Sequence, residues 1–271
     1  MTKETINKEI RTAFAKLDQE GIKERQHAVA WCAEETELFD TKFFAEILLR
    51  ESDPICKWYA IRALGDLRAN QYAELLVDVL RQPDIEVGKS SLHLICARSI
   101  GLLGSQMVPH IVELLDEPNE ATRLAAADTL GEIGHHSAIP ALSCCLTSGE
   151  RNLQLWASLS LGKIGTESIP EFIKALSSAT KEDALIFLDA LLIIGTPSII
   201  DAVIEIMNKY PDVVQFYLTG TQPERVKYFL YMLQDIISSG APCKDSAEKI
   251  LSFLKLKTSS ISRDDISHLS K

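Results

Sequence analysis

Two pairs of adjacent side chains in this sequence are of types that do chemistry. His135 and His136 could ligate a metal ion or transfer protons, and Cys144 and Cys145 could bind a soft metal or be oxidised. Either use needs further ligands or an orienting partner at suitable spacing. Neither pair has such His or Cys neighbours. We therefore expect the histidines in a turn, the cysteines in a helix, and no metal site or catalytic residue.

The sequence also lacks the common signatures of free-standing enzymes. It has no P-loop, no G-x-S-x-G motif and no dinucleotide-binding fingerprint after a strand. Without these motifs, the sequence does not support a free-standing hydrolase or NTPase. A binding protein without intrinsic activity is the expected class.

Charge and hydropathy narrow the set of partners. Lys and Arg number 28 against 38 Asp and Glu, a net charge of -10, which disfavours nucleic acid as the main partner. The longest apolar run, "ALIFLDALLIIG", is interrupted by Asp189 and is too short to cross a bilayer. The start "MTKETINKEI" has no signal-peptide pattern, and the six cysteines form no C-x-x-C. We expect a cytoplasmic protein with free thiols and no membrane partner.

One motif recurs along the chain with a period near 30 residues. It reads "AIRALGDL", "CARSIGLLG", "AADTLGEIG", "SLSLGKIG" and "LDALLIIG". Each copy has one landmark residue near its end, and these residues are Gly65, Gly101, Gly131, Gly162 and Leu192. Successive landmarks are 36, 30, 31 and 30 positions apart (101-65, 131-101, 162-131 and 192-162). A shorter helical pattern, such as "AIPALSCCL", precedes each motif. Each repeat is therefore a first helix followed by a second helix that carries the landmark.

The predicted fold is all-α, an α-solenoid (superhelix) of about six helical-hairpin repeats with terminal capping helices and no extended strands. We predict a single domain over 1–256. It comprises an N-terminal cap and degenerate repeat over 1–35, regular repeats over 36–209 and C-terminal capping helices over 210–256. The capping helix at the N-terminus is expected near 6–17, and "PDVVQFYLTGTQP" is expected to be a loop. The polar segment 257–271 is predicted to be a disordered tail.

The motif "LAAADTLGEIGHHSAIPALSCCL" resembles the HEAT-like repeats of the phycobilisome (PBS) lyase type, over roughly 25–207. The stretch "VGKSSLHLICARSIGLLG" is similar to the lengthened repeat of E-type bilin lyase subunits. Proteins with such repeats include bilin lyase subunits, phycobilisome assembly and degradation factors, and general binding scaffolds. The resemblance does not extend to deoxyhypusine hydroxylase, which binds iron through His-Glu pairs, because no His here is followed by Glu.

Helical phase predicts which residues of the second helices face a groove. We number each second helix so that its landmark residue is position nine. Residues at positions zero, four, seven, eight and eleven then share one side of the helix and should pack against the first helices. Positions two and six lie on the opposite side, where aromatic residues add flat contact area. The predicted groove wall comprises Trp58, Arg62, Leu94, Arg98, Leu124, Asp128, Leu155, Trp156, Leu159, Leu185 and Asp189. The apolar members of this ladder are either exposed for a ligand or packed between neighbouring repeats.

Two ligands would suit this wall. One is another protein, bound through an amphipathic helix, in which case the chain is a scaffold or assembly factor without a cofactor. The other is a linear tetrapyrrole, whose propionates would pair with Arg62 or Arg98 and whose pyrrole nitrogens would contact Asp128. The chain would then be a bilin lyase subunit acting with a second subunit on a phycobiliprotein cysteine.

A further row of residues occupies position one. We expect these residues to hydrogen-bond to acidic residues of adjacent turns and thereby to fix the geometry of the repeats. They are Arg25, Lys57, His93, Arg123 and Gln154.

Overall fold

The computed structural model describes residue 8, 21–220 and 223–254. In these residues the fold is all-α, with fifteen α-helices arranged as helical hairpins in the manner of an α-solenoid. The chain forms two compact units, 1–141 and 142–271, which we describe separately. The capping helix expected near 6–17, apart from residue 8, and the expected tail over 257–271 lie outside the described residues. The boundaries of a single domain over 1–256 stay a prediction.

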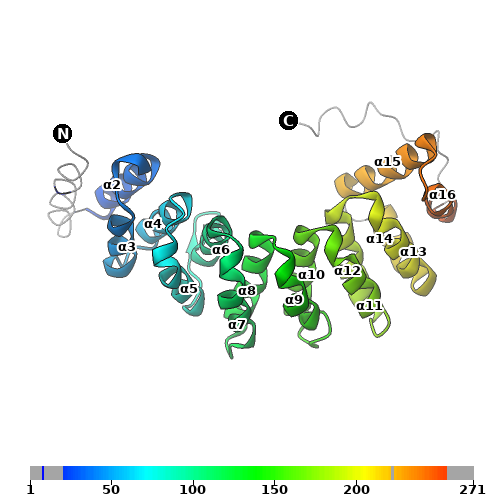
Figure 1. Ribbon diagram of the computed structural model, residues 1–271, viewed down its shortest axis with the longest axis horizontal. Coiled ribbons are helices and arrows are strands. Elements are labelled where there is room, and N and C mark those ends of the chain that lie inside the picture. The colour runs from blue at the N-terminus through cyan, green and yellow to red at the C-terminus, as the bar shows by residue number, and fades with distance from the viewer. Residues whose placement is uncertain (1–7, 9–20, 221–222, 255–271) are drawn as a thin grey trace. The chain divides into compact units, whose positions relative to one another are not determined.

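Unit 1 consists of α2, the second helix of the degenerate repeat, and three hairpins, α3/α4, α5/α6 and α7/α8. The second helices α4, α6 and α8 pack side by side in chain order, as Figure 1 shows. The helices of this unit are α2 (Ile22–Glu34), α3 (Thr41–Arg50), α4 (Pro54–Asp66), α5 (Ala73–Arg81), α6 (Leu92–Leu103), α7 (Val108–Glu113) and α8 (Glu120–Ile133).

Short polar side chains start the helices of this unit. The carboxylate of Asp53 accepts a hydrogen bond from the backbone N–H of Cys56 at 2.9 Å, and Pro54 begins α4. The hydroxyl of Ser91 likewise accepts from the N–H of Leu94 at 3.2 Å at the start of α6. These caps set the helical phase and thus decide which side chains face outward.

The lengthened repeat contains a small sheet that the sequence analysis did not predict. Strand β1 (Glu86–Val87) pairs antiparallel with β2 (Ser90–Ser91) through a turn at Gly88, whose φ is 64°. The expectation of no strands was wrong here because two-residue strands are too short to show an alternating pattern. The hairpin contacts α4, since the indole N–H of Trp58 donates to the hydroxyl of Ser90 at 3.2 Å.

Unit 2 continues the hairpin pattern and ends in longer helices. The first helix α9 begins in the last residues of unit 1 and precedes α10. The helices are α9 (Ile139–Cys145), α10 (Arg151–Ile164), α11 (Ile169–Leu176), α12 (Lys181–Ile194), α13 (Ile200–Lys209), α14 (Pro211–Gly220), α15 (Pro223–Ser239) and α16 (Lys244–Phe253). Helices α15 and α16 occupy the region 210–256, where C-terminal capping helices are predicted.

Helix α14 corrects the loop expected at "PDVVQFYLTGTQP". It starts at Pro211, directly after α13, and buries Val214 and Leu218 one turn apart. It packs against α12 and α13 and so takes the place of a further second helix. The Pro at its start and the Gly at its end suit a helix as well as a loop.

Three of the four landmark glycines lie where consecutive second helices of one unit touch. A Cβ on Gly65 would lie 2.6 Å from Cβ of Ser99, and one on Gly101 would lie 2.8 Å from the carbonyl oxygen of Glu132. In unit 2, a Cβ on Gly162 would lie 2.8 Å from the carbonyl oxygen of Ala190. In α4, α6, α8 and α10 the residues at positions zero, four, seven and eight are buried as predicted. They include Cys56, Ala60, Ala63, Leu64, Thr122, Ala126, Thr129 and Leu130. Leu67 and Ile133, at position eleven, are half-buried.

Substitution of Gly101 tests this close contact. Gly101→Ala would force the backbone carbonyl of Glu132 away, which typically destabilises a protein by about 1–3 kcal/mol. The higher helix preference of Ala offsets about 1 kcal/mol of this loss. We expect the free energy of unfolding to fall by about 0–2 kcal/mol, measured by chemical denaturation. Arg98→Ala on the exposed side of the same helix is the control, with an expected change within about 0.5 kcal/mol. A Gly101→Ala protein more stable than the parent by about 1 kcal/mol, the full helix preference of Ala, would contradict the contact.

Candidate functional site

The outward face of α6 carries an arginine between two exposed leucines. Leu94 is 49% exposed and Leu102 is 37% exposed, and Arg98 lies exposed one turn from each. In the described part of the chain, Arg98 makes no hydrogen bond or ion pair. Leu102, at position ten, was missed by the sequence analysis, although its spacing of four from Arg98 places it on the same side. This face can bind an apolar surface that also bears a carboxylate.

An aromatic cluster on α4 lies beside this face. The guanidinium of Arg62 lies 5.7 Å from the ring centre of Trp58 and 5.4 Å from that of Tyr59, within cation–π range. The two rings meet edge to face at 5.2 Å. Because α4 packs against α6, the outward sides of both helices form one surface, which we call the α4–α6 face: Trp58, Arg62, Leu94, Arg98 and Leu102.

Arg62 is held by its own chain more firmly than Arg98. It donates to the carbonyl oxygen of Ala33 at 3.4 Å, and its Nε lies 3.9 Å from a carboxylate oxygen of Asp66. Its position is thereby fixed before any ligand arrives. Arg98 is the cation of this face that is free to pair with a ligand carboxylate.

Asp128 and Asp189 are predicted to lie on an open groove wall, but their side chains are buried and half-buried, respectively. Asp128, on α8, is only 7% exposed. Asp189, half-buried on α12, accepts a hydrogen bond from the hydroxyl of Tyr217 on α14. Asp189 therefore has a structural role within unit 2.

The other predicted wall residues differ in exposure. Leu155 and Trp156, on α10 in unit 2, are exposed at 37% and 36%. Leu124, Leu159 and Leu185 are half-buried, as are Trp58 and Arg62. The apolar ladder is thus open on α6 and α10 and partly packed on α4, α8 and α12.

The row at position one bonds mainly to backbone oxygens, not to the acidic side chains expected. The side chains of His93, Arg123 and Gln154 bond to the carbonyl oxygens of Gln82, Glu117 and Leu146 at 2.8, 2.7 and 3.0 Å. Arg25 is the member that meets the expectation, with its Nε 3.2 Å from a carboxylate oxygen of Glu51. Each of these contacts holds a turn ahead of a second helix.

The histidine and cysteine pairs have the structural settings expected. Nδ1 of His135 bonds to the hydroxyl of Ser137 at 2.9 Å in the turn after α8, and Cys144 is exposed while Cys145 is buried. No cluster of His, Cys, Asp or Glu suited to a metal ion occurs among the described residues. Burial raises the pKa of Cys32 and Cys56 to about 12, so both thiols stay protonated at neutral pH. Over the same residues, no helix has the length and hydropathy needed to cross a membrane.

Comparison with protein families identifies the repeat. A HEAT-repeat model matches residues 92–153 and 108–188, and the model of the PBS lyase HEAT-like repeat matches residues 57–82. The chain contains HEAT repeats. The predicted repeat class is thereby confirmed, and no curated protein matches the sequence.

Three solved structures are similar to this chain to different degrees. A chain of the structure of Kap95p with RanGDP is 13% identical, with a TM-score of 0.59, over 90% of this chain and 37% of that chain. A chain of the CpcE–CpcF complex of phycocyanin lyase from Nostoc sp. PCC7120 is 19% identical, with a TM-score of 0.44, over 94% of each chain. An engineered protein is 21% identical, with a TM-score of 0.48, over 94% of this chain and 72% of its own. The Kap95p likeness bears on the fold alone.

Proposed function

We propose that this protein is a binding scaffold that holds a protein partner on the α4–α6 face. The observation that carries the proposal is Arg98, exposed and without a partner among the described residues, between the exposed Leu94 and Leu102. HEAT repeats, found here, commonly serve to bind proteins.

The chemistry of the face suits a protein surface. A single exposed leucine is ordinary, but two on one helix face, beside Trp58 and Tyr59, form an apolar strip. Covering a leucine fully stabilises a complex by roughly 1.5–3 kcal/mol. Aromatic and arginine side chains are the types that most often dominate binding energy at interfaces. An amphipathic helix with a carboxylate opposite Arg98 would satisfy both the apolar and the charged groups.

Site-specific photo-crosslinking tests this proposal. With p-benzoylphenylalanine in place of Leu94, we expect a discrete crosslinked protein in cells that naturally express this chain. Adding Arg98→Glu should lower the yield by about tenfold, because like charges then face each other. The matched control places the same crosslinker at Ile173, an exposed apolar position on the first helix α11. The same product from position 173, or a yield unchanged by Arg98→Glu, would argue against the α4–α6 face.

A second candidate function is that of a bilin lyase subunit acting with a second subunit on a phycobiliprotein. The supporting observation is that the PBS lyase HEAT-like repeat, residues 57–82, contains the cluster of Trp58, Tyr59 and Arg62. A flat tetrapyrrole could stack on these rings and pair a propionate with an arginine. The chain would then promote the reaction by orienting the bilin and the acceptor thiol. The buried Asp128 has no part in this version of the site.

The visible spectrum of phycocyanobilin tests the second candidate. On mixing with the purified protein we expect a shifted band that Trp58→Ala abolishes, because the stacking surface is lost. Trp31→Ala is the control, since Trp31 is an exposed indole of unit 1 that lies outside the cluster. A spectrum that stays unchanged, both with the protein alone and with a candidate second subunit, would rule this function out.

A further inference from the structure

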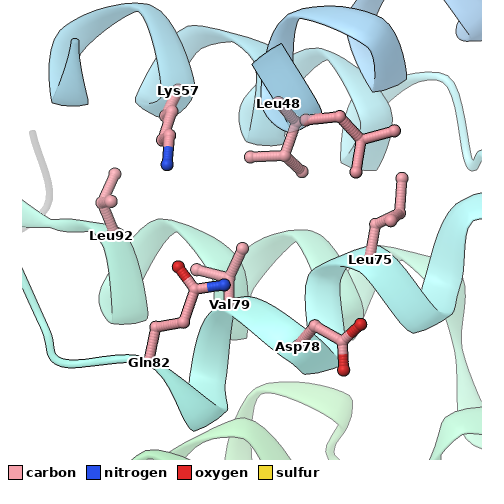
Figure 2. A pocket seen from close by; sticks show the side chains of 8 residues that line it. Leu48, Lys57, Leu75, Asp78, Val79, Gln82 and Leu92 are labelled. Atoms are coloured by element: carbon pink, nitrogen blue, oxygen red, sulfur yellow. The ribbon is translucent and has the colours of Figure 1, made fainter. Parts of the chain in front are cut away.

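Unit 1 has a hollow that shares no residue with the α4–α6 face. It lies between the α3/α4 and α5/α6 hairpins, and Figure 2 shows side chains from both hairpins pointing into it. Its lining residues are Leu48, Leu49, Lys57, Leu75, Asp78, Val79, Gln82 and Leu92.

Most of this lining is aliphatic. Leu48, Val79 and Leu92 are buried, and Leu49 at the rim is 66% exposed. The polar groups come from Lys57, Asp78 and Gln82. In Figure 2 the ammonium of Lys57 points into the space between the hairpins, with the amide of Gln82 on the opposite wall.

Lys57 differs from its counterparts at position one. His93, Arg123 and Gln154 each bond to a carbonyl oxygen in the turn ahead of their helix. Lys57 makes no such bond, and no ion pair, within the described residues. The turn ahead of α4 is instead held by the ion pair of Arg25 with Glu51 and by the Asp53 cap. The ammonium of Lys57 is therefore free for another purpose.

The charges around the hollow leave Lys57 uncompensated. The nearest lining carboxylate, Asp78, is paired with Arg81 at 3.0 Å, and Arg81 also approaches Glu117 at 3.5 Å. The hollow thus offers a cation beside an aliphatic floor. A group that matches it must combine a carboxylate with an adjacent aliphatic side chain.

We propose that this hollow binds a short segment of a protein partner in which Leu, Ile or Val adjoins Asp or Glu. The aliphatic side chain packs on Leu48, Val79 and Leu92, and the carboxylate accepts hydrogen bonds from the ammonium of Lys57 and the amide of Gln82. The inference rests on the proposed function only in that the ligand is part of a protein. The site and the binding chemistry are separate from those of the α4–α6 face.

Methyl NMR of the full chain tests the site with a defined probe. The probe is Ac-Gly-Leu-Glu-Gly-NH2, and its neutral match is Ac-Gly-Leu-Gln-Gly-NH2. We expect the Glu peptide to shift the methyl signals of Leu48, Val79 and Leu92 with a Kd on the order of 1 mM, about fivefold tighter than the Gln peptide. Lys57→Met should remove this difference, Lys57→Arg should keep it, and Lys42→Met on the exposed side of α3 should leave it unchanged.

Three outcomes would overturn the proposal. The first is the absence of shifts at these methyl groups up to about 10 mM peptide, and the second is equal binding of the Glu and Gln peptides. The third is binding of free isovalerate as tightly as the peptide, which would assign the hollow to small carboxylates. Arg98→Glu should leave peptide binding intact, so failure of the α4–α6 face and failure of this site are distinguishable.

Discussion

The close contact between consecutive second helices is the constraint on which the rest of this structure depends. Gly65 meets Ser99, Gly101 meets the Glu132 backbone and, in unit 2, Gly162 meets the Ala190 backbone, each with no room for a side chain. Helices that approach this closely bury the small residues on either side of the contact. On α6 the opposite side of the helix is left outward, and this is where its exposed residues lie.

The same constraint explains why equivalent positions differ in what they can do. Arg98 and Asp128 both occupy position six, yet Arg98 is exposed and Asp128 is buried. Helix α8 carries three successive alanines before Asp128, whereas the outward face of α6 carries the exposed Leu94, Arg98 and Leu102. The residues at position one also differ in what they contact. Lys57 makes no bond to the turn ahead of its helix, because the Arg25–Glu51 ion pair and the Asp53 cap already hold that turn. Function in a repeat array arises at such departures from the repeat.

Much of the fold could be predicted because the landmark spacing and helical phase are local properties of the sequence. The hairpins, the buried positions and the turn role of His135 all follow from them. Helix α14 could not, since Pro211 and Gly220 mark a loop and a helix equally well. Exposure on the predicted wall could not be predicted either, because it depends on how closely neighbours approach. Thus Leu94 is exposed and Asp128 is buried, although helical phase assigns both residues to the same wall.

Hydrogen–deuterium exchange of the full chain, alone and with the partner captured by crosslinking, shows whether the α4–α6 face binds a protein. We expect slower amide exchange in α4 and α6, around Trp58 to Arg62 and Leu94 to Leu102, with α7 unchanged. Protection confined to α7, or to unit 2, would show that the protein does not bind on this face.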